Sequence, residues 1–568
     1  MSPALQRILF AILVIGCGVR LLYLVEQPSF PAFHQPEVDA HYYDQSARAI
    51  AAGDWVLGHE PLRMSPGYFY FLGSIYSVVG PGPWAPRLIQ IALGLLLVWF
   101  VWDTARRVLG SWWAPWPAAV AAFYGPYLYF EGHLLADSLG AFLHALLMWC
   151  AVVAMQATDA KGARRWFGVG VVWGLCCVTR PNALPLLAPL AYAAWSVAGE
   201  VTRRVRTGWI AAIALGGALA IAPITARNFV ASGQPVLLTS HGGINLFVGN
   251  GPGATGTWRS PPEVPGAEGP LEQFSLFHDK AEQLVGRRLT EGQADDYWVD
   301  RTVAEVVTHP VKWARLMSWK LYLYFNGREL HNVYDYEFWR EVSLVLGPPL
   351  AEFLYIAPFG LAGLLLLAWR PGVGRFLALY AATIAAAIIL VYVTDRYRLP
   401  VVAPLLVIGT AFVREMVAYA RAARWRPVAG WFALWLAACV VAVPVKVNKR
   451  FDEKYHHLGE AWLHLNQIPF AEWALLKSLG HNPQFIPSHW DLATLYERRG
   501  IRLFAMTHLH QIEGIAKKRG DTALLARARS EMERLMPRPP VRPVAPAATG
   551  LPGASAVPVA PAAPQAPP

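Results

Sequence analysis

The stretch QRILFAILVIGCGVRLLYLVE, residues 6–26, decides the class of fold. An apolar segment of this length can cross the hydrocarbon core of a bilayer as a helix. Its start is too long and too weakly bounded for a cleaved signal peptide, so we interpret it as an anchor. We predict an all-α polytopic membrane protein with about eleven transmembrane helices. The further apolar runs lie at 85–105, 113–130, 136–156, 166–179, 182–198, 208–226, 346–368, 374–393, 399–415 and 428–446.

The composition of the whole chain agrees with this class. Of the 568 residues, 55% are hydrophobic and only 15% are charged, whereas soluble domains carry about 25% charged residues. The net charge of +11 could suggest nucleic acid, but the Lys and Arg residues form short clusters between the apolar runs. The five cysteines all lie in apolar runs, without the spacing of a metal site. We therefore predict no nucleic-acid partner.

The basic clusters indicate an orientation in the membrane. If the N-terminus is cytoplasmic, every second connection is rich in Arg or Lys, as the positive-inside rule requires. Residues 27–84 and 227–345, and the chain beyond 446, then face outside. The basic residues of the inner connections are Arg106, Arg107, Lys161, Arg164, Arg165, Arg203, Arg204, Arg206, Arg370, Arg375, Arg414, Arg421, Arg424 and Arg426.

An acidic, aromatic run, Glu37-Val-Asp39-Ala-His41-Tyr42-Tyr43-Asp44, follows the first apolar helix. Charges close to hydrocarbon lose hydration, so they usually pair, bind or catalyse. On the outer face no nucleotide-activated substrate is normally available. Any group transfer there needs a donor already carried across the membrane, most plausibly attached to a lipid.

The outer connections contain several further elements. We expect residues 65–80 to form a short helix in the membrane interface. Glu131 and Asp137 form a second acidic pair. Residues 227–345 are predicted to be mixed, with a strand-like run at 235–243 and helices over 291–325.

Beyond residue 446 the composition becomes that of a soluble region. At an offset of 34 residues, Gly459 matches Ala493 and Leu475 matches Leu509. This pattern resembles tetratricopeptide repeats, stacked helical pairs that can bind a partner protein. We predict such repeats over 452–536 and a disordered Pro/Ala-rich tail over 537–568.

The order of these sequence motifs along the chain resembles that of a known family. Residues 1–446 resemble membrane glycosyltransferases of the GT-C fold, in the bacterial branch related to protein O-mannosyltransferases and the aminoarabinose transferase of lipid A. The matching pieces are the run at 37–43, Gly53-Asp54-Trp55, Ser65-Pro66-Gly67-Tyr68, Arg87, Glu131 with Asp137, Thr179-Arg180-Pro181-Asn182, Gly243-Ile-Asn245 with Gly249-Asn250, Glu329, and Arg396-Tyr397-Arg398-Leu399-Pro400.

The resemblance implies that a sugar is transferred from a polyprenyl-phosphate donor to a hydroxyl of a lipid, glycan or protein. It also implies that this transfer takes place on the non-cytoplasmic face of the bacterial inner membrane. It assigns the general base to the first outer loop: Asp39, with Glu37 left open and Glu131 a further catalytic candidate. A carboxylate can take the acceptor proton, and the leaving phosphate needs cations. One base opposite the leaving phosphate predicts inversion. The expected donor-binding residues are His41, Tyr42, Tyr43, Arg63, Arg87, Asp137, Arg180, His241, Asn245, Glu329, Arg396 and Arg398.

No cofactor is required by this chemistry, but a divalent metal stays open. Asp39, Glu131 and His133, with His41, offer oxygen and imidazole ligands, although their spacing is a weak signal.

Each candidate also has a structural interpretation. Asp39 could cap a helix, Glu131 could pair with an arginine such as Arg180, and Arg63 and Arg87 could snorkel to headgroups. The main alternative function is a transporter or flippase for a lipid-linked sugar. A membrane anchor for the repeats is the third.

Overall fold

The computed structural model describes residues 2–156, 162–199, 201–266, 270–332, 334–445 and 450–536. The chain divides into two compact units, Met1–Lys449 and Arg450–Pro568. The described residues contain helices and no strand, apart from an isolated bridge between Tyr124 and Ala351. The all-α prediction is therefore confirmed for these residues, and the predicted strand at 235–243 is wrong. Residues 235–241 are irregular, and Gly242 begins a helix.

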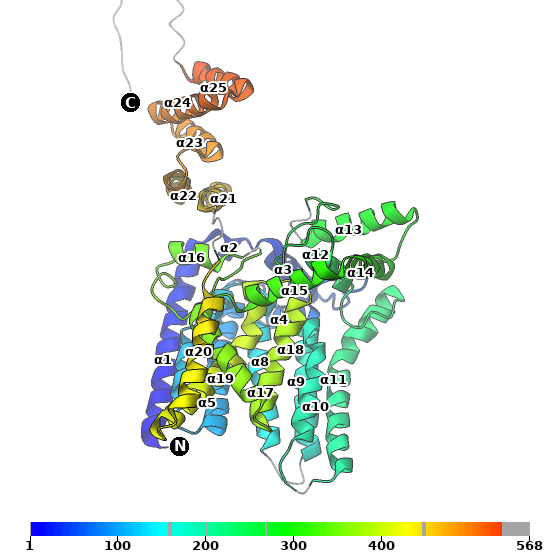
Figure 1. Cartoon of the computed structure of the whole chain (residues 1–568). Coiled ribbons are helices and arrows are strands. Elements are labelled where there is room, and N and C mark those ends of the chain that lie inside the picture. Colours follow the sequence, from blue (N-terminus) through cyan, green and yellow to red (C-terminus); the bar gives the residue numbers. More distant parts are fainter. Residues whose placement is uncertain are drawn as a thin grey trace, which may run out of the picture. The chain divides into compact units, whose positions relative to one another are not determined.

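Long apolar helices build the first unit (Figure 1). Six are long and apolar enough to cross a membrane. The first of them joins α1 to the 3-10 helix η1 (Gln27–Ser29). The six are α1 (Pro3–Glu26), α5 (Trp84–Leu109), α8 (Ala136–Met155), α11 (Arg203–Ser232), α19 (Asp395–Arg421) and α20 (Trp425–Ala442).

Other predicted spans are shorter or interrupted. The helices α9 (Gly162–Thr179), α17 (Phe353–Ala368) and α18 (Val373–Ile389) each form one piece. The run at 113–130 is instead split into α6 (Pro115–Ala122) and α7 (Gly125–Glu131). The number of about eleven transmembrane helices stays a prediction.

The two interruptions have local causes. Between α6 and α7 the backbone bonds to Ala351 instead of to itself: Gly125 donates to the Ala351 carbonyl at 2.9 Å, and the Ala351 amide donates to Phe123 at 2.9 Å. The run at 182–198 begins as a 3-10 helix, η2 (Pro181–Leu186), and continues as α10 (Leu187–Trp195). Prolines within it cannot donate helical hydrogen bonds.

Glycines allow α9 and α11 to approach closely. A Cβ atom on Gly170 of α9 would overlap the carbonyl oxygen of Ile213, and one on Gly216 of α11 would overlap that of Phe167. Small residues at such contacts bring helix backbones together and so increase dispersion contacts in an apolar solvent.

Shorter helices gather at one end of the first unit (Figure 1). Residues 291–325 are helical as predicted, with a break at His309 where Pro310 opens the second helix. The helices at this end are α2 (Pro31–His34), α3 (Val38–Ala51), α12 (Gly242–Asn250), α13 (Pro270–Val285), α14 (Glu291–Thr308), α15 (Pro310–Phe325) and α16 (Tyr336–Val342).

The helix expected at residues 65–80 is α4 (Pro66–Val79). It packs inside the protein: a Cβ on Gly67 would lie 2.6 Å from Thr179 Oγ1 of α9, and one on Gly73 would lie 2.7 Å from the Ile50 side chain of α3. Tyr68 is fully buried. This helix thus links α3 to the membrane bundle.

The second unit consists of helices over its described residues, 450–536. Residues that match at the 34-residue offset, such as Leu475 and Leu509, are buried in it. The assignment to tetratricopeptide repeats stays a prediction, and the tail at 537–568 lies outside the described residues. The helices are α21 (Phe451–His464), α22 (Ile468–His481), α23 (Ile486–Arg498), α24 (Arg502–Arg519) and α25 (Thr522–Leu535).

Candidate active site

A cavity of about 500 Å³ lies where the short helices meet the bundle. Its walls come from α3, from residues 63–65, from η2, from residues 239–245, and from the connection between α18 and α19. Segments far apart in sequence therefore meet here. The predicted site residues that line it are Asp39, Tyr43, Arg63, Arg180, His241, Asn245 and Arg396.

Asp39 stands in the first turn of α3 with 8% of its surface exposed. The preceding residue, Val38, has φ +49°, which a β-branched residue rarely adopts. Tyr334 holds this turn: its hydroxyl donates to the Glu37 carbonyl at 2.8 Å and accepts from the Ala40 amide at 3.1 Å. Strained backbone of this kind persists only where the surroundings fix it. The direction of Asp39 is therefore set by its neighbours.

Asp39 pairs with an arginine from the beginning of α19. Arg396 Nη1 lies 2.5 Å from Asp39 Oδ2, and both residues are buried. A second arginine, Arg180, pairs with Asp137. Both guanidinium groups lie against the ring of Tyr397, Arg180 at 4.6 Å and Arg396 at 5.3 Å from its centre. The cavity thus holds one carboxylate and two cations around one aromatic ring.

His241 supplies a neutral polar group to the wall of the cavity. Burial lowers its pKa to about 3, with a smaller lowering from Arg63 and an opposing effect of Asp39. Its Nδ1 atom is buried without a hydrogen-bond partner among the described residues, and its ring meets Phe274 edge-on at 4.5 Å. At neutral pH this imidazole can donate or accept one hydrogen bond but carries no charge.

Asn245 and two tyrosines continue this wall. The Tyr392 hydroxyl donates to Asn245 Oδ1 at 3.0 Å and lies 3.3 Å from the Tyr397 hydroxyl. Asp295 accepts hydrogen bonds from the amides of Gly243 at 2.7 Å and Ile244 at 3.1 Å. These contacts fix the first turn of α12, which carries Asn245, against α14.

Lys320 anchors the cavity wall from behind. It is fully buried, and its Nζ donates to Asn250 Oδ1 at 2.9 Å and to the Val391 carbonyl at 2.6 Å. Val391 lines the cavity. Burial lowers the pKa of Lys320 to about 7. A neutral amine still has two N–H donors for these two acceptors.

A pH dependence of stability follows from this lysine. Between pH 7 and about 10.5 the unfolded chain holds a proton on Lys320 that the folded protein lacks, so the wild type should gain stability with rising pH, by up to about 1.4 kcal/mol per pH unit. We expect the thermal midpoint of the wild type minus that of Lys320→Met to grow from pH 7 to 9.5. A difference that stays constant would show that the buried amine does not titrate in this range.

Glu131 does not line the cavity. Its carboxylate is buried and accepts from Arg20 Nε at 2.7 Å and Nη2 at 3.2 Å, while Arg20 Nη1 donates to the Ala122 carbonyl at 2.8 Å. Arg180, which we considered as a partner of Glu131, pairs with Asp137 instead. The contacts of Glu131 are those of a structural ion pair between α1 and α7.

The suggested metal ligands Asp39, Glu131 and His133 do not converge. Asp39 and Glu131 each bind their own arginine, and His133 Nδ1 bonds to the Tyr129 carbonyl at 2.8 Å. Among the described residues, one group of three His, Cys, Asp or Glu side chains is close enough to share a metal ion, and it lies in the second unit.

Two other residues that were predicted to bind the sugar donor, Arg398 and Glu329, instead stabilise the structure around the cavity. Arg398 Nη2 lies 2.7 Å from Glu329 Oε2, Arg398 Nη1 donates to the Asn326 carbonyl at 2.7 Å, and its guanidinium lies 4.3 Å from the Phe353 ring centre. Neither Arg398 nor Glu329 borders the cavity. This pair fixes the beginning of α19 and with it the position of Arg396.

Arg87 is buried rather than snorkelling. It donates to the carbonyls of Gly132 and Pro83, both at 2.7 Å, and its guanidinium lies over the Phe33 ring. Glu37 and His41 are exposed, and Tyr42 is half-buried. None of these four residues is among those that line the cavity.

Several cavity residues were not predicted as site residues. Tyr397 and Asn182 stood inside the quoted motifs, so their neighbours gave a signal. Others come from loops and helices that showed no pattern in the sequence, among them Trp258, Gln273, Phe274, Asn332 and Tyr392.

Comparison with known families bears on the segment that contains Arg63, Asp137 and Arg180. Residues 60–226 match the family described as dolichyl-phosphate-mannose-protein mannosyltransferase. The resemblance to membrane glycosyltransferases related to protein O-mannosyltransferases is thereby confirmed. No curated relative matches the chain.

Two solved structures are similar to this chain over most of its length. One is the archaeal oligosaccharyltransferase AglB from Archaeoglobus fulgidus in complex with an inhibitory peptide and a dolichol-phosphate, with 13% identity, a TM-score of 0.40 and 81% of this chain covered. The chain spans 58% of that protein's length. The other is ArnT from Cupriavidus metallidurans bound to undecaprenyl phosphate, with 14% identity, a TM-score of 0.34, and 74% of this chain and 80% of the other covered.

Proposed function

We propose that the protein transfers a sugar from a polyprenyl-phosphate donor to an acceptor hydroxyl inside this cavity. The observation that carries the proposal is the buried pair of Asp39 and Arg396 in its wall. A carboxylate that can take a proton and a cation that can bind phosphate are the two groups this reaction needs. The confirmed resemblance of residues 60–226 supports the same reaction class.

The arrangement suggests how the groups act in order. The donor phosphate competes with Asp39 for Arg396, because a phosphate presents more acceptor oxygens and more charge than a carboxylate. Once Arg396 binds phosphate, Asp39 is released to accept the proton of the attacking hydroxyl. The hydroxyl oxygen then bonds to the anomeric carbon as the bond to the phosphate oxygen breaks. Attack opposite the leaving group inverts the anomeric carbon.

The size of the cavity agrees with a small sugar headgroup. Ligand pockets typically measure about 300–1,000 Å³, and this one measures about 500 Å³. Aromatic rings beside polar groups suit a sugar, which presents both apolar faces and hydroxyls. Trp258, Phe274, Tyr392 and Tyr397 provide such rings.

Purified protein offers a direct test of this function. We would incubate it with polyprenyl-phosphate sugars of different headgroups and measure released polyprenyl phosphate, which water can produce slowly when no acceptor is present. Release from at least one donor, above that of protein with the cavity filled by Asn245→Trp, is the expected result. Tight donor binding without release, combined with movement of the lipid-linked sugar across vesicle membranes, would instead establish a transporter.

Of the three arginines that line the cavity, Arg180 and Arg396 should differ from Arg63 in donor binding. Arg63 is bound by two carboxylates, Glu60 at 2.5 Å and Glu291 at 2.8 Å, whereas Arg180 and Arg396 each pair with one and flank Tyr397. Loss of a charge-assisted hydrogen bond weakens binding by about 1.5–3 kcal/mol. We therefore expect Arg180→Ala to raise the donor Kd about 10- to 100-fold and Arg63→Ala to change it less than threefold.

The donor affinities of Arg63→Ala and Arg180→Ala can support or contradict the proposed position of the phosphate. A thermal midpoint for each variant separates misfolding from lost binding, since Arg180→Ala leaves Asp137 without its partner. If Arg63→Ala weakens donor binding as much as Arg180→Ala does, the phosphate lies nearer the 63–65 segment than we propose.

The positive-inside distribution supports a site on the non-cytoplasmic face, with the N-terminus cytoplasmic. Reporter fusions ending after residues 84, 160, 345 and 446 should report outside, inside, outside and outside. A cytoplasmic signal at 345 would place α12 to α15 on the wrong side for a lipid-carried donor, and the proposed function would fail with it.

A further inference from the structure

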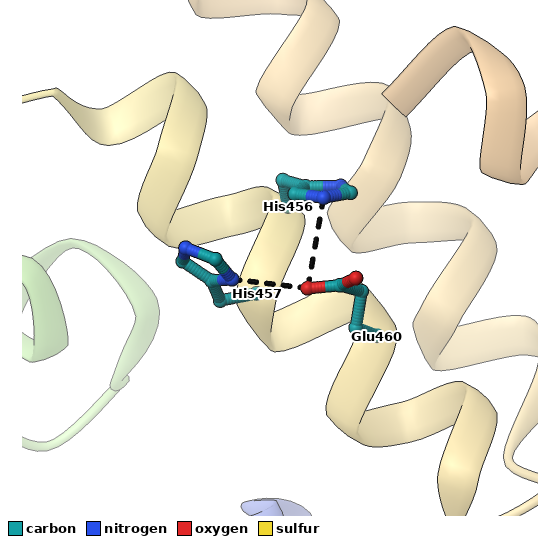
Figure 2. Close-up of side chains that lie close together, drawn as sticks. All are labelled: His456, His457 and Glu460. Atoms are coloured by element: carbon teal, nitrogen blue, oxygen red, sulfur yellow. Dashed lines mark hydrogen bonds and ion pairs between the residues drawn. The ribbon is translucent and has the colours of Figure 1, made fainter. Parts of the chain in front are cut away.

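Helix α21 in the second unit presents three potential metal ligands side by side (Figure 2). His457 Nδ1 lies 3.0 Å from Glu460 Oε2, and His456 Nε2 lies 3.6 Å from the same oxygen. One ligand atom of each residue lies within 4.8 Å of the others. The three residues come from one helical turn, so their positions do not depend on a loop.

These distances suit a tetrahedral transition-metal ion. Zinc binds imidazole nitrogen and carboxylate oxygen at about 2.0–2.2 Å, so neighbouring ligand atoms lie about 3.3–3.6 Å apart around it. The two measured separations, 3.0 and 3.6 Å, enclose this range closely. Imidazole ligands favour zinc, copper or nickel over magnesium or calcium. Small side-chain rotations would bring all three atoms to bonding distance.

A fourth residue stands where a metal-bound histidine needs support. Asp491 Oδ2, from α23, lies 3.3 Å from His456 Nδ1, the ring nitrogen that does not face Glu460. Metal-binding histidines usually donate their second ring N–H to a carboxylate, which fixes the tautomer and the ring direction. His456 is 7% exposed. Its Nδ1 and Asp491 Oδ2 make no hydrogen bond with any described residue, so a small rotation of the ring would let this N–H donate to Asp491. This contact is independent of the three-residue cluster and favours Nε2 as a ligand atom.

We propose that α21 holds a zinc-class divalent metal site formed by His456 Nε2, His457 Nδ1 and Glu460 Oε2, with Asp491 orienting His456. The fourth coordination position is open to water. The site belongs to the second unit and does not rest on the proposed glycosyl transfer. His457 is largely exposed, so the ion can enter from solvent.

The test uses the tag-free full-length protein in detergent. Zinc chloride is titrated against a chromophoric zinc chelator, and the Kd and the number of bound ions are measured for wild type and variants. We expect wild type to bind one ion with a Kd of about 1 µM or below at this site. His457→Ala and Glu460→Ala should each abolish this tight zinc binding. Asp491→Asn should raise the Kd for zinc about 10- to 100-fold.

His510→Ala serves as the matched control. His510 and Glu513 also lie three positions apart on one helix, α24, with 3.6 Å between Nδ1 and Oε2, but no third ligand joins them within the described residues. This variant should keep wild-type zinc binding. Wild type without an ion tighter than about 10 µM, or equal losses in His510→Ala and His457→Ala, would overturn the proposal.

Discussion

Asp39→Asn should lower the rate of sugar transfer by about 10²- to 10⁴-fold, the range that a positioned general base contributes. The amide has nearly the shape of the carboxylate, and its oxygen can still accept from Arg396. It cannot take the proton of the acceptor hydroxyl. Donor binding should therefore be retained, or become tighter because the neutral amide competes less with the phosphate for Arg396, while turnover is lost. Release of polyprenyl phosphate and donor Kd, measured on the same preparation, check both parts.

Asp44→Asn provides the matched control for this variant. Asp44 lies on the same helix with the same 8% exposure, but it pairs with Arg48 at 2.6 Å and accepts from the Tyr76 hydroxyl at 2.6 Å, outside the cavity. Its substitution should leave the rate per folded molecule intact. Glu37→Gln examines the other acid of the run. If Glu37→Gln abolishes turnover and Asp39→Asn does not, the roles are reversed.

Glu131→Ala should destabilise the protein by about 3–5 kcal/mol, because it leaves the buried charge of Arg20 without its partner. The side chains of this pair are 0% and 5% exposed, so solvent screens the charge little. The expected signature is loss of folded protein with wild-type turnover in the molecules that remain folded. Denaturant unfolding in mixed micelles and activity per folded molecule are the two measurements.

A double variant separates lost charge balance from lost packing. Arg20→Met combined with Glu131→Leu removes both charges at similar volume, and such replacements are often neutral or stabilising. This protein should be more stable than Glu131→Ala. A Glu131→Ala protein with wild-type stability and no turnover would instead show that Glu131 takes part in catalysis.

The sequence allowed the helical class and much of the cavity to be predicted for a physical reason. Long apolar runs specify membrane helices with little help from tertiary contacts, and charged residues beside them need a partner or a function. This is why the acidic run that contains Asp39 was found, whereas Arg180 and Arg396 were proposed through the family resemblance. The strand predicted at 235–243 failed, because short apolar runs fit either secondary structure and packing decides between them.

The partners of the charged residues could not be predicted in the same way. Arg20, inside the first apolar run, binds Glu131, and Arg180 binds Asp137 rather than Glu131. Each pair depends on how helices rotate and cross, which hydrophobic runs do not specify. Trp258 and Phe274 were missed for a related reason. An irregular loop carries Trp258 to the cavity, and Phe274 reaches it from α13, whose position the sequence pattern does not specify.

The pairing of Asp39 with Arg396 has a consequence for biosynthesis. The two residues are 357 positions apart in the chain. At about 5–20 residues per second, the ribosome needs roughly 20–70 s after making Asp39 before Arg396 exists. During that interval the carboxylate must stay hydrated. The exported position that we propose for the first loop would keep the carboxylate in water, and its pair with Arg396 can form only after α19 has been made. Maturation of this site is therefore a late event in membrane insertion.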